Sequence, residues 1–294
     1  MFENWILKPP TPQWNKQRTT LDLHERQKES SLISKEINFK NQIDFDIKCD
    51  ELKENGIMQV ENFISKKQAK EMYNYFMTKK CYDFYGIHQS FNLDNVPNHV
   101  KLGRHTIKDN LLCPNMIDLI TNEKLTKTAS SYLGCPATLS LVLPMWSFPQ
   151  VTENPINMQL YHRDADDYKF VKFFILLNDV EIGEGEQIYI KGSHIKDDLP
   201  KNMYEIVRYT SEQVYEHFEQ EQAKTIFGES GTSWFADTYG IHRGTVPKRK
   251  NRLILQLQFT YADVPIFNYN SYRYSKWKEL SDLIKYSTRL YIRE

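Results

Sequence analysis

Gln159-Leu-Tyr-His-Arg-Asp164 places a histidine and an aspartate two residues apart in a segment with the pattern of a β-strand. Alternate residues of an extended chain point to the same side, so His162 and Asp164 can bind one metal ion together. A second histidine, His242, occurs later in the chain, and Arg252 follows it by ten residues. Two histidines and one carboxylate on one face of a metal, with the other positions open, form a ligand set typical of non-haem Fe(II) sites.

Around this stretch the chain contains a series of short strand candidates separated by Asn, Asp, Gly and Pro. Such a series favours a β-sandwich or barrel over alternating βαβ units. The candidates are residues 138–148, 156–164, 168–178, 186–191, 231–236, 241–246 and 252–261.

The last of these strands alternates between an apolar and a more polar face. The apolar face carries Leu253, Leu255, Leu257 and Phe259, and the other carries Arg252, Ile254, Gln256 and Gln258. The polar face can meet water, as in an ordinary antiparallel sheet, or line a ligand cavity inside a barrel. The neighbouring His242 favours the cavity.

Helices are expected ahead of these strands. Ser65-Lys-Lys-Gln68 has the form of a capping box, and apolar residues recur after it at helical spacing. Pro114 suits a first helical position, and Gly134 suits a C-terminal cap, so a helix or helix pair is expected between them. The recurring apolar residues after the capping box, which should pack the helix on a sheet, are Ala69, Met72, Tyr73 and Phe76.

The 294 residues are expected to divide into an N-terminal arm and one domain. Residues 1–45 are polar and charged, typical of an arm that lies on the domain, with one possible helical piece. Residues 46–294 carry all the strand candidates and should form one domain with helical decorations.

Composition gives no sign of a nucleic-acid or membrane partner. Lys plus Arg (38) equal Asp plus Glu (38), so no overall field favours nucleic acid or an anionic membrane. The four cysteines are widely spaced, typical of buried reduced thiols. No leader pattern is present, and no run approaches the roughly 18 apolar residues of a membrane span. We therefore expect a soluble, cytoplasmic protein that binds a small molecule.

Several segments in this order resemble the phytanoyl-CoA dioxygenase family of Fe(II)- and 2-oxoglutarate-dependent oxygenases. The resemblance covers roughly Cys113 to Tyr261. Its segments are Ser131-Tyr-Leu-Gly134, Gln159-Leu-Tyr-His-Arg-Asp164, Lys172-Phe-Phe-Ile-Leu-Leu-Asn-Asp-Val180, Ile190-Lys-Gly-Ser-His194 and Ile241-His-Arg-Gly244 with Arg252.

The resemblance implies a mainly β fold with flanking helices (α+β), built on a double-stranded β-helix, the jelly roll of cupin-like proteins. His162, Asp164 and His242 would bind Fe(II) and leave positions for 2-oxoglutarate and O2. Arg252 would bind the distal carboxylate of 2-oxoglutarate through its planar fork. Hydroxylation of a substrate C–H bond, with release of succinate and CO2, is the implied reaction. Halogenating relatives have a small residue in place of Asp164, so its presence favours hydroxylation; desaturation or ring closure stays open.

Three further residues are expected near the cosubstrate: Gln159, Lys172 and Trp234. Gln159 matches a position where the family often has a glutamine, but strict alternation from His162 points it away. A bulge or the end of the strand would reconcile the two.

Other polar residues are interpreted as structural. Arg163 and Arg243 flank ligands and should face away by alternation, and His194 belongs to a Gly-Ser-His turn. The isolated histidines and the remaining aspartates of the region fit surface, hydrogen-bonding or turn roles. These are His88, His99, His105, Asp166, Asp167, Asp179 and Asp237.

Residues 81–111 and 195–225 should shape the substrate pocket, and Tyr and Arg in the second suit a polar, anionic or sugar-like small molecule. Three alternatives stay open: a jelly-roll module that binds metal without catalysis, an oxygenase acting on a macromolecule or glycan, and a zinc hydrolase. The last leaves Arg252 unexplained.

Overall fold

The computed structural model describes residues 23–41, 47–61, 63–86, 90–149, 159–204, 208–265 and 267–294. Most of the expected arm lies outside these residues. Its described part is helix α2 (Leu23–Asn41), which packs Ile33 and Ile37 against the core. The division into an arm of residues 1–45 and a domain of residues 46–294 stays a prediction.

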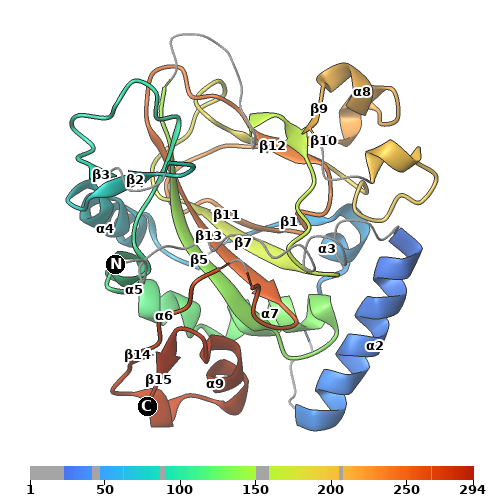
Figure 1. Cartoon of the computed structure of the whole chain (residues 1–294), viewed down its shortest axis with the longest axis horizontal. Helices are drawn as coiled ribbons and strands as arrows, with labels where there is room; N and C mark the ends of the chain where they lie inside the picture. The colour runs from blue at the N-terminus through green and yellow to red at the C-terminus, as the bar shows by residue number, and fades with distance from the viewer. Residues whose placement is uncertain are drawn as a thin grey trace.

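Two antiparallel sheets form the centre of the molecule (Figure 1). The larger sheet has the order β1 (Ile57–Val60), β11 (Ser233–Ala236), β7 (Val171–Leu176), β13 (Arg252–Thr260), β5 (Thr138–Ser147), β4 (Leu102–Arg104), β2 (Cys81–Asp83) and β3 (Ser90–Phe91). The smaller sheet has the order β10 (Ala223–Ile226), β8 (Gln187–Ile190), β12 (His242–Gly244), β6 (Tyr161–His162) and β9 (Arg208–Tyr209). A short parallel pair, β14 (Tyr272–Arg273) and β15 (Ile292–Arg293), lies near the C-terminus. The mainly β architecture with flanking helices is confirmed.

Helices cover the face of the larger sheet that points away from the smaller one, in the lower part of Figure 1. Helices α5 and α9 contact β5, and α7 contacts β7. The helices after α2 are α3 (Asp50–Asn55), α4 (Lys66–Met77), α5 (Ile107–Leu111), α6 (Met116–Ile120), α7 (Glu123–Leu133), α8 (Ser211–Tyr215) and α9 (Asp282–Thr288). Short 3-10 turns occur at Lys201–Met203, Gln220–Gln222 and Trp277–Glu279.

Strand β13 is buried along its whole length, although its two faces differ in polarity. Leu253, Leu255, Leu257 and Phe259 are fully buried on one face. On the other face, Arg252 and Gln256 line a cavity that the smaller sheet also lines. The interpretation of the polar face as a cavity wall is therefore correct, and the alternative of bulk water is excluded.

The helix pair expected before the strands exists, but it begins later than predicted. Helix α6 begins at Met116, and its N-cap Asn115 adopts φ 62°, so Pro114 is not the first helical residue. Helix α7 ends at Gly134 with φ 77°, as the glycine predicts. The chain turns sharply at Asn115 instead of continuing from the proline, which sequence spacing did not indicate.

The capping box at Ser65 and Gln68 is confirmed at the start of α4. Phe76, on its buried face, is inaccessible to solvent and stacks on His105 with ring centroids 4.8 Å apart. Phe76→Ala should therefore lower the free energy of unfolding by about 3–5 kcal/mol, measured by urea denaturation. Met77 is 39% exposed, so Met77→Ala should change it by about 0.5 kcal/mol or less. Similar losses in both variants would contradict the packing of α4 described here.

All four cysteines are buried free thiols that form no disulfide, in agreement with the prediction. Burial raises the pKa of Cys81, Cys113 and Cys135 to about 12. These thiols are therefore inert packing residues. None of the helices in the described ranges is long and apolar enough to cross a membrane.

Candidate metal centre

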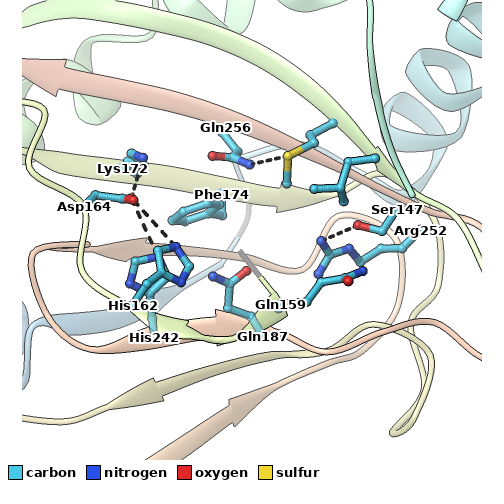
Figure 2. A pocket seen from close by; sticks show the side chains of 13 residues that line it. Ser147, Gln159, His162, Asp164, Lys172, Phe174, Gln187, His242, Arg252 and Gln256 are labelled. Carbon is cyan, nitrogen blue, oxygen red and sulfur yellow. Dashed lines mark hydrogen bonds and ion pairs between the residues drawn. The ribbon is translucent and has the colours of Figure 1, made fainter. Parts of the chain in front are cut away.

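A cavity that opens to solvent is lined by both sheets (Figure 2). The smaller sheet and its adjoining turns contribute Gln159, His162, Asp164, Gln187, His242 and Gly244. The larger sheet contributes Leu102, Met145, Ser147, Lys172, Phe174, Arg252 and Gln256. Charged groups gather at two places in the cavity, around Asp164 and around Arg252 (Figure 2).

His162 and His242 are direct partners across the β6–β12 pairing, so their side chains project from the same face of the smaller sheet. Their Nε2 atoms lie 3.6 and 3.7 Å from the two carboxylate oxygens of Asp164. The backbone N–H of Asp164 donates to Thr238 O at 2.8 Å, which fixes the aspartate beside the histidines. Ligand atoms of these three residues lie within 4.8 Å of one another, close enough for one metal ion.

Both imidazoles are held with Nε2 free toward the cavity. Nδ1 of His162 bonds Leu160 O at 2.8 Å, and Nδ1 of His242 bonds Gly240 O at 2.9 Å. A carbonyl oxygen only accepts, so each Nδ1 carries the proton and each Nε2 keeps its lone pair. Burial lowers the pKa of His162 to about 3 and also lowers that of His242. Both rings are therefore neutral at physiological pH, the state in which imidazole binds a metal.

The third member, Asp164, is ionised. Burial by itself would raise its pKa, but the ammonium of Lys172 outweighs burial and holds this pKa well below its ordinary value. The donor set is therefore two imidazole nitrogens and one carboxylate oxygen. This set suits a divalent first-row metal.

Lys172 binds the ligand carboxylate directly. Its Nζ lies 2.7 Å from Asp164 Oδ2 and 3.4 Å from Asp166 Oδ2. The two carboxylates raise the pKa of Lys172 against the effect of burial. Lys172 was expected near the cosubstrate, and it does line the cavity, but its ammonium bonds to these aspartates. Asp166 was expected in a turn role and instead shares this ion pair, while burial raises its pKa.

Lys172→Met should lower the free energy of unfolding of the metal-free protein by about 3 kcal/mol, because it leaves two largely buried carboxylates without their counterion. Mn2+ should restore part of this loss, since the dication can replace the ammonium beside Asp164. Urea denaturation with chelator and with Mn2+ measures both effects, and Lys172→Arg is the charge-preserving control. Unchanged stability of the metal-free variant would show that the ion pair is unimportant.

Arg252 begins β13 at the other end of the cavity and is 3% exposed. Its Nη2 donates to Ser147 Oγ at 2.8 Å and its Nη1 donates to Gly185 O. Its Nε has no hydrogen-bond partner among the described residues. Burial lowers its pKa to about 10, which still leaves it charged at neutral pH. A Cβ at Gly244 would lie 3.1 Å from Nη1, so the glycine provides space for the guanidinium.

No carboxylate of the described chain forms an ion pair with Arg252, although the charge of Glu186 lies within electrostatic range. A buried guanidinium without a bonded anion is costly, because its solvation is lost and only neutral acceptors replace it. An organic carboxylate in the cavity would complete its bonding. This observation shows that Arg252 fits an anionic ligand.

Gln159 and Trp234 differ in their relation to the cavity. Gln159 lines it; because β6 begins only at Tyr161, the alternation that would turn Gln159 away does not apply. Trp234 lies on β11 directly across from Phe174, and the two rings stack with centroids 5.2 Å apart. Phe174 lines the cavity and Trp234 does not, so the structure does not bring Trp234 to this site.

The residues interpreted as structural make the expected contacts. Arg163 is fully buried and donates to three backbone oxygens, of Met203, Ser193 and Tyr239. Arg243 lies over the Tyr161 ring at 4.4 Å, and His194 Nε2 bonds Lys53 O at 3.0 Å. Asp167, Asp179 and Asp237 accept backbone N–H groups of Tyr261, Ser230 and Tyr239. His99 is exposed, and His88 lies outside the described residues.

His105 is a buried structural histidine. Its Nδ1 bonds Lys80 O at 2.9 Å, and its Nε2 accepts from Trp146 Nε1 at 2.8 Å. Burial lowers its pKa from 6.5 to about 4. The unfolded chain therefore binds more protons between these two pH values, and stability falls as pH drops through this window.

We expect the urea midpoint of the wild-type apoprotein to fall between pH 7 and pH 5, and that of His105→Gln to fall less. Glutamine is neutral at both pH values, so the variant lacks one titrating group that must stay uncharged in the folded protein. Parallel losses in the two proteins would contradict the buried neutral state of His105.

Several lining residues were not predicted, notably Ser147, Phe174 and Gln187. Phe174 is two residues from Lys172 on β7, so alternation alone could have indicated it. Ser147 faces Arg252 in the β5–β13 register, and Gln187 faces Gly244 in the β8–β12 register. No sequence signal gives these pairings.

No protein-family model matches the chain, and no curated protein sequence matches it. Similar solved structures include the non-haem α-ketoglutarate-dependent epimerase SnoN from nogalamycin biosynthesis, at 14% identity and TM-score 0.52, covering 72% of this chain and 80% of that one. HygX from Streptomyces hygroscopicus, with nickel and 2-oxoglutarate bound, is 12% identical with TM-score 0.50, covering 77% and 91%. EctD from S. alaskensis, with 2-oxoglutarate and 5-hydroxyectoine, is 13% identical with TM-score 0.50, covering 74% and 75%. At these identities the likeness shows the fold: the chain has the jelly-roll fold of these enzymes.

Proposed function

We propose that the protein is an Fe(II)- and 2-oxoglutarate-dependent oxygenase that hydroxylates a C–H bond of a small polar molecule and releases succinate and CO2. One observation carries the proposal. A neutral histidine pair with an ionised aspartate and a buried arginine without a bonded carboxylate line the same cavity.

The metal ligands fit Fe(II). The Nε2 lone pairs of His162 and His242 and the carboxylate of Asp164 would hold the ion, a ligand set that in Fe(II) oxygenases leaves room for further ligands. Arg252 fits the distal carboxylate of 2-oxoglutarate, because a guanidinium binds a carboxylate through two parallel hydrogen bonds. A zinc hydrolase would use the same three ligands but gives this arginine no role.

The chain's own contribution is binding, orientation and exclusion of water. The carbonyls of Leu160 and Gly240 fix the two imidazoles, and Lys172 fixes the carboxylate of Asp164. The near-complete burial of His162, His242 and Arg252 limits the contact of these three side chains with bulk water. When bound, Fe(II) with 2-oxoglutarate and O2 supplies the oxidising chemistry, as in other cofactor enzymes.

Within this group we assign the chain to the phytanoyl-CoA dioxygenase family, on the ordered motifs around His162, Lys172, His194 and His242. Hydroxylation is proposed as the outcome because Asp164 completes the ligand set. A cytoplasmic location is proposed because the four thiols are unpaired, which is typical of a reducing compartment.

Succinate formation tests the proposal. Purified protein with Fe(II), ascorbate, 2-oxoglutarate and O2 should form succinate above the rate of His242→Ala, and pools of small polar metabolites should increase that rate. Arg243→Ala, on the other side of β12, should behave as the wild type. A wild-type rate equal to that of His242→Ala in every pool would favour a module that binds metal without catalysis.

A further inference from the structure

Arg208 occupies the position directly across from His162 in the smaller sheet. Strand β9 pairs with β6 in antiparallel register, with Tyr161 facing Tyr209 and His162 facing Arg208. Residues directly opposite in such a pair project from the same face of the sheet. The side chain of Arg208 therefore leaves the sheet on the side of the metal ligands.

The other face of the same two strands is occupied by a separate apolar cluster. Tyr161 and Tyr209 are 1% and 3% exposed and pack there with Val214 of α8 and with Phe218. Alternation along β9 consequently excludes Arg208 from this cluster and directs it to the cavity side.

The side chain of Arg208 is exposed, and within the described ranges it makes no hydrogen bond or ion pair. Its charge is one cause of the lowered pKa of both His162 and His242, so it lies within electrostatic range of both rings. The other two cations near the ligands are engaged: Lys172 with Asp164 and Asp166, and Arg252 with Ser147 and Gly185. Arg208 is therefore an uncommitted cation beside the proposed metal centre.

The other cations of the site have anionic groups near them: Lys172 bonds Asp164 and Asp166, and Glu186 lies within electrostatic range of Arg252. The side chain of Arg208 has no bonded counterion among the described residues, and a cation without a partner favours an anionic ligand.

We propose that Arg208 binds an oxyanion of the substrate, so that the enzyme selects small organic molecules bearing a carboxylate or a phosphate monoester. This inference rests on the proposed function and names its substrate class. A guanidinium binds either group through two parallel hydrogen bonds. Bound in this way, the anion would hold the rest of the substrate over the open side of the metal ligands.

Paramagnetic relaxation tests this role without a known substrate. The protein is loaded with Mn2+ and 2-oxoglutarate, and the 31P relaxation of methyl phosphate is followed during titration. Neutral trimethyl phosphate is the matched probe without charge, and 13C-labelled acetate gives the carboxylate arm. The variants are Arg208→Gln, Arg208→Lys, and Arg273→Gln as the control for an exposed arginine in β14, near the C-terminus (Figure 1).

The wild type and Arg273→Gln should show saturable relaxation enhancement with methyl phosphate or acetate and none with trimethyl phosphate. Arg208→Gln should bind the anion at least about tenfold more weakly, and Arg208→Lys should recover part of the affinity. The probe with the larger saturable effect identifies the phosphate or the carboxylate as the preferred group. Absence of saturable enhancement in the wild type, or equal enhancement in Arg208→Gln, would overturn the inference.

This result is independent of the succinate assay. Succinate formation without Arg208-dependent anion binding would leave the proposed function intact and remove the substrate class. Anion binding at Arg208 without succinate formation in any metabolite pool would instead refute the proposed function.

Discussion

Asp164→Ala should reduce 2-oxoglutarate turnover to background and should weaken Fe(II) binding. The loss of affinity should exceed the roughly 10–100-fold loss that follows when a residue hydrogen-bonded to a metal ligand is removed. The variant removes the one anionic member of the three-residue cluster. The two neutral histidines alone give the dication no compensating charge. The fold should persist, since Lys172 keeps Asp166 as its ion-pair partner.

Calorimetric titration with Fe(II) under anaerobic conditions measures the affinity, and circular dichroism checks the fold. Asp166→Asn is a matched control, because Asp166 pairs with the same lysine but lies outside the metal cluster. Retained Fe(II) affinity in Asp164→Ala, or an equal loss in Asp166→Asn, would show that the ligands are assigned wrongly.

Arg252→Met should weaken 2-oxoglutarate binding by about 2–5 kcal/mol, or roughly thirtyfold to several thousandfold. The substitution removes the buried cation and keeps most of the apolar volume. Fe(II) affinity should change little, because Arg252 is not part of the metal cluster.

Equilibrium titration of the metal-loaded protein with 2-oxoglutarate measures this effect. Arg243→Met controls for loss of an arginine, since Arg243 contacts Tyr161 and does not line the cavity. Arg252→Lys should recover part of the binding, because the ammonium keeps the charge but loses the planar fork. An Arg252→Met protein with wild-type affinity would remove the arginine from the cosubstrate site.

The ligands could be predicted from sequence because their signals are local. The i, i+2 spacing of His162 and Asp164 places both on one side of an extended segment, and the structure brings them to His242. The alternation along β13 likewise separates its apolar face from the face that carries Arg252 and Gln256. Both features depend only on the period of a strand.

Features that depend on strand pairing could not be predicted. Ser147 reaches Arg252 only through the β5–β13 register, and only the β6–β9 register places Arg208 opposite His162. Trp234 was expected near the cosubstrate, but it pairs across from Phe174 on β7, and Phe174 lines the cavity while Trp234 does not. Register depends on contacts between distant segments, which one sequence does not reveal.

Gln159 lines the cavity as expected, because it lies before the short β6 and the period of the strand does not extend to it. Lys172 illustrates a third case, in which the residue was identified but its contact was not. Lys172 lines the cavity as expected, yet the ionised Asp164 and Asp166 compete for its ammonium. The pairing of opposite charges within the site determines this contact, and the spacing of residues in the sequence does not predict such pairing.

Anaerobic visible spectroscopy of the apoprotein, titrated with Fe(II) and then 2-oxoglutarate, tests the central claim most directly. The arrangement of His162, Asp164, His242 and Arg252 predicts a weak metal-to-ligand charge-transfer band that appears only with both additions. The same band should be absent in Asp164→Ala and should require far more 2-oxoglutarate in Arg252→Met. A folded wild-type protein that binds Fe(II) but gives no band at saturating 2-oxoglutarate would contradict the claim.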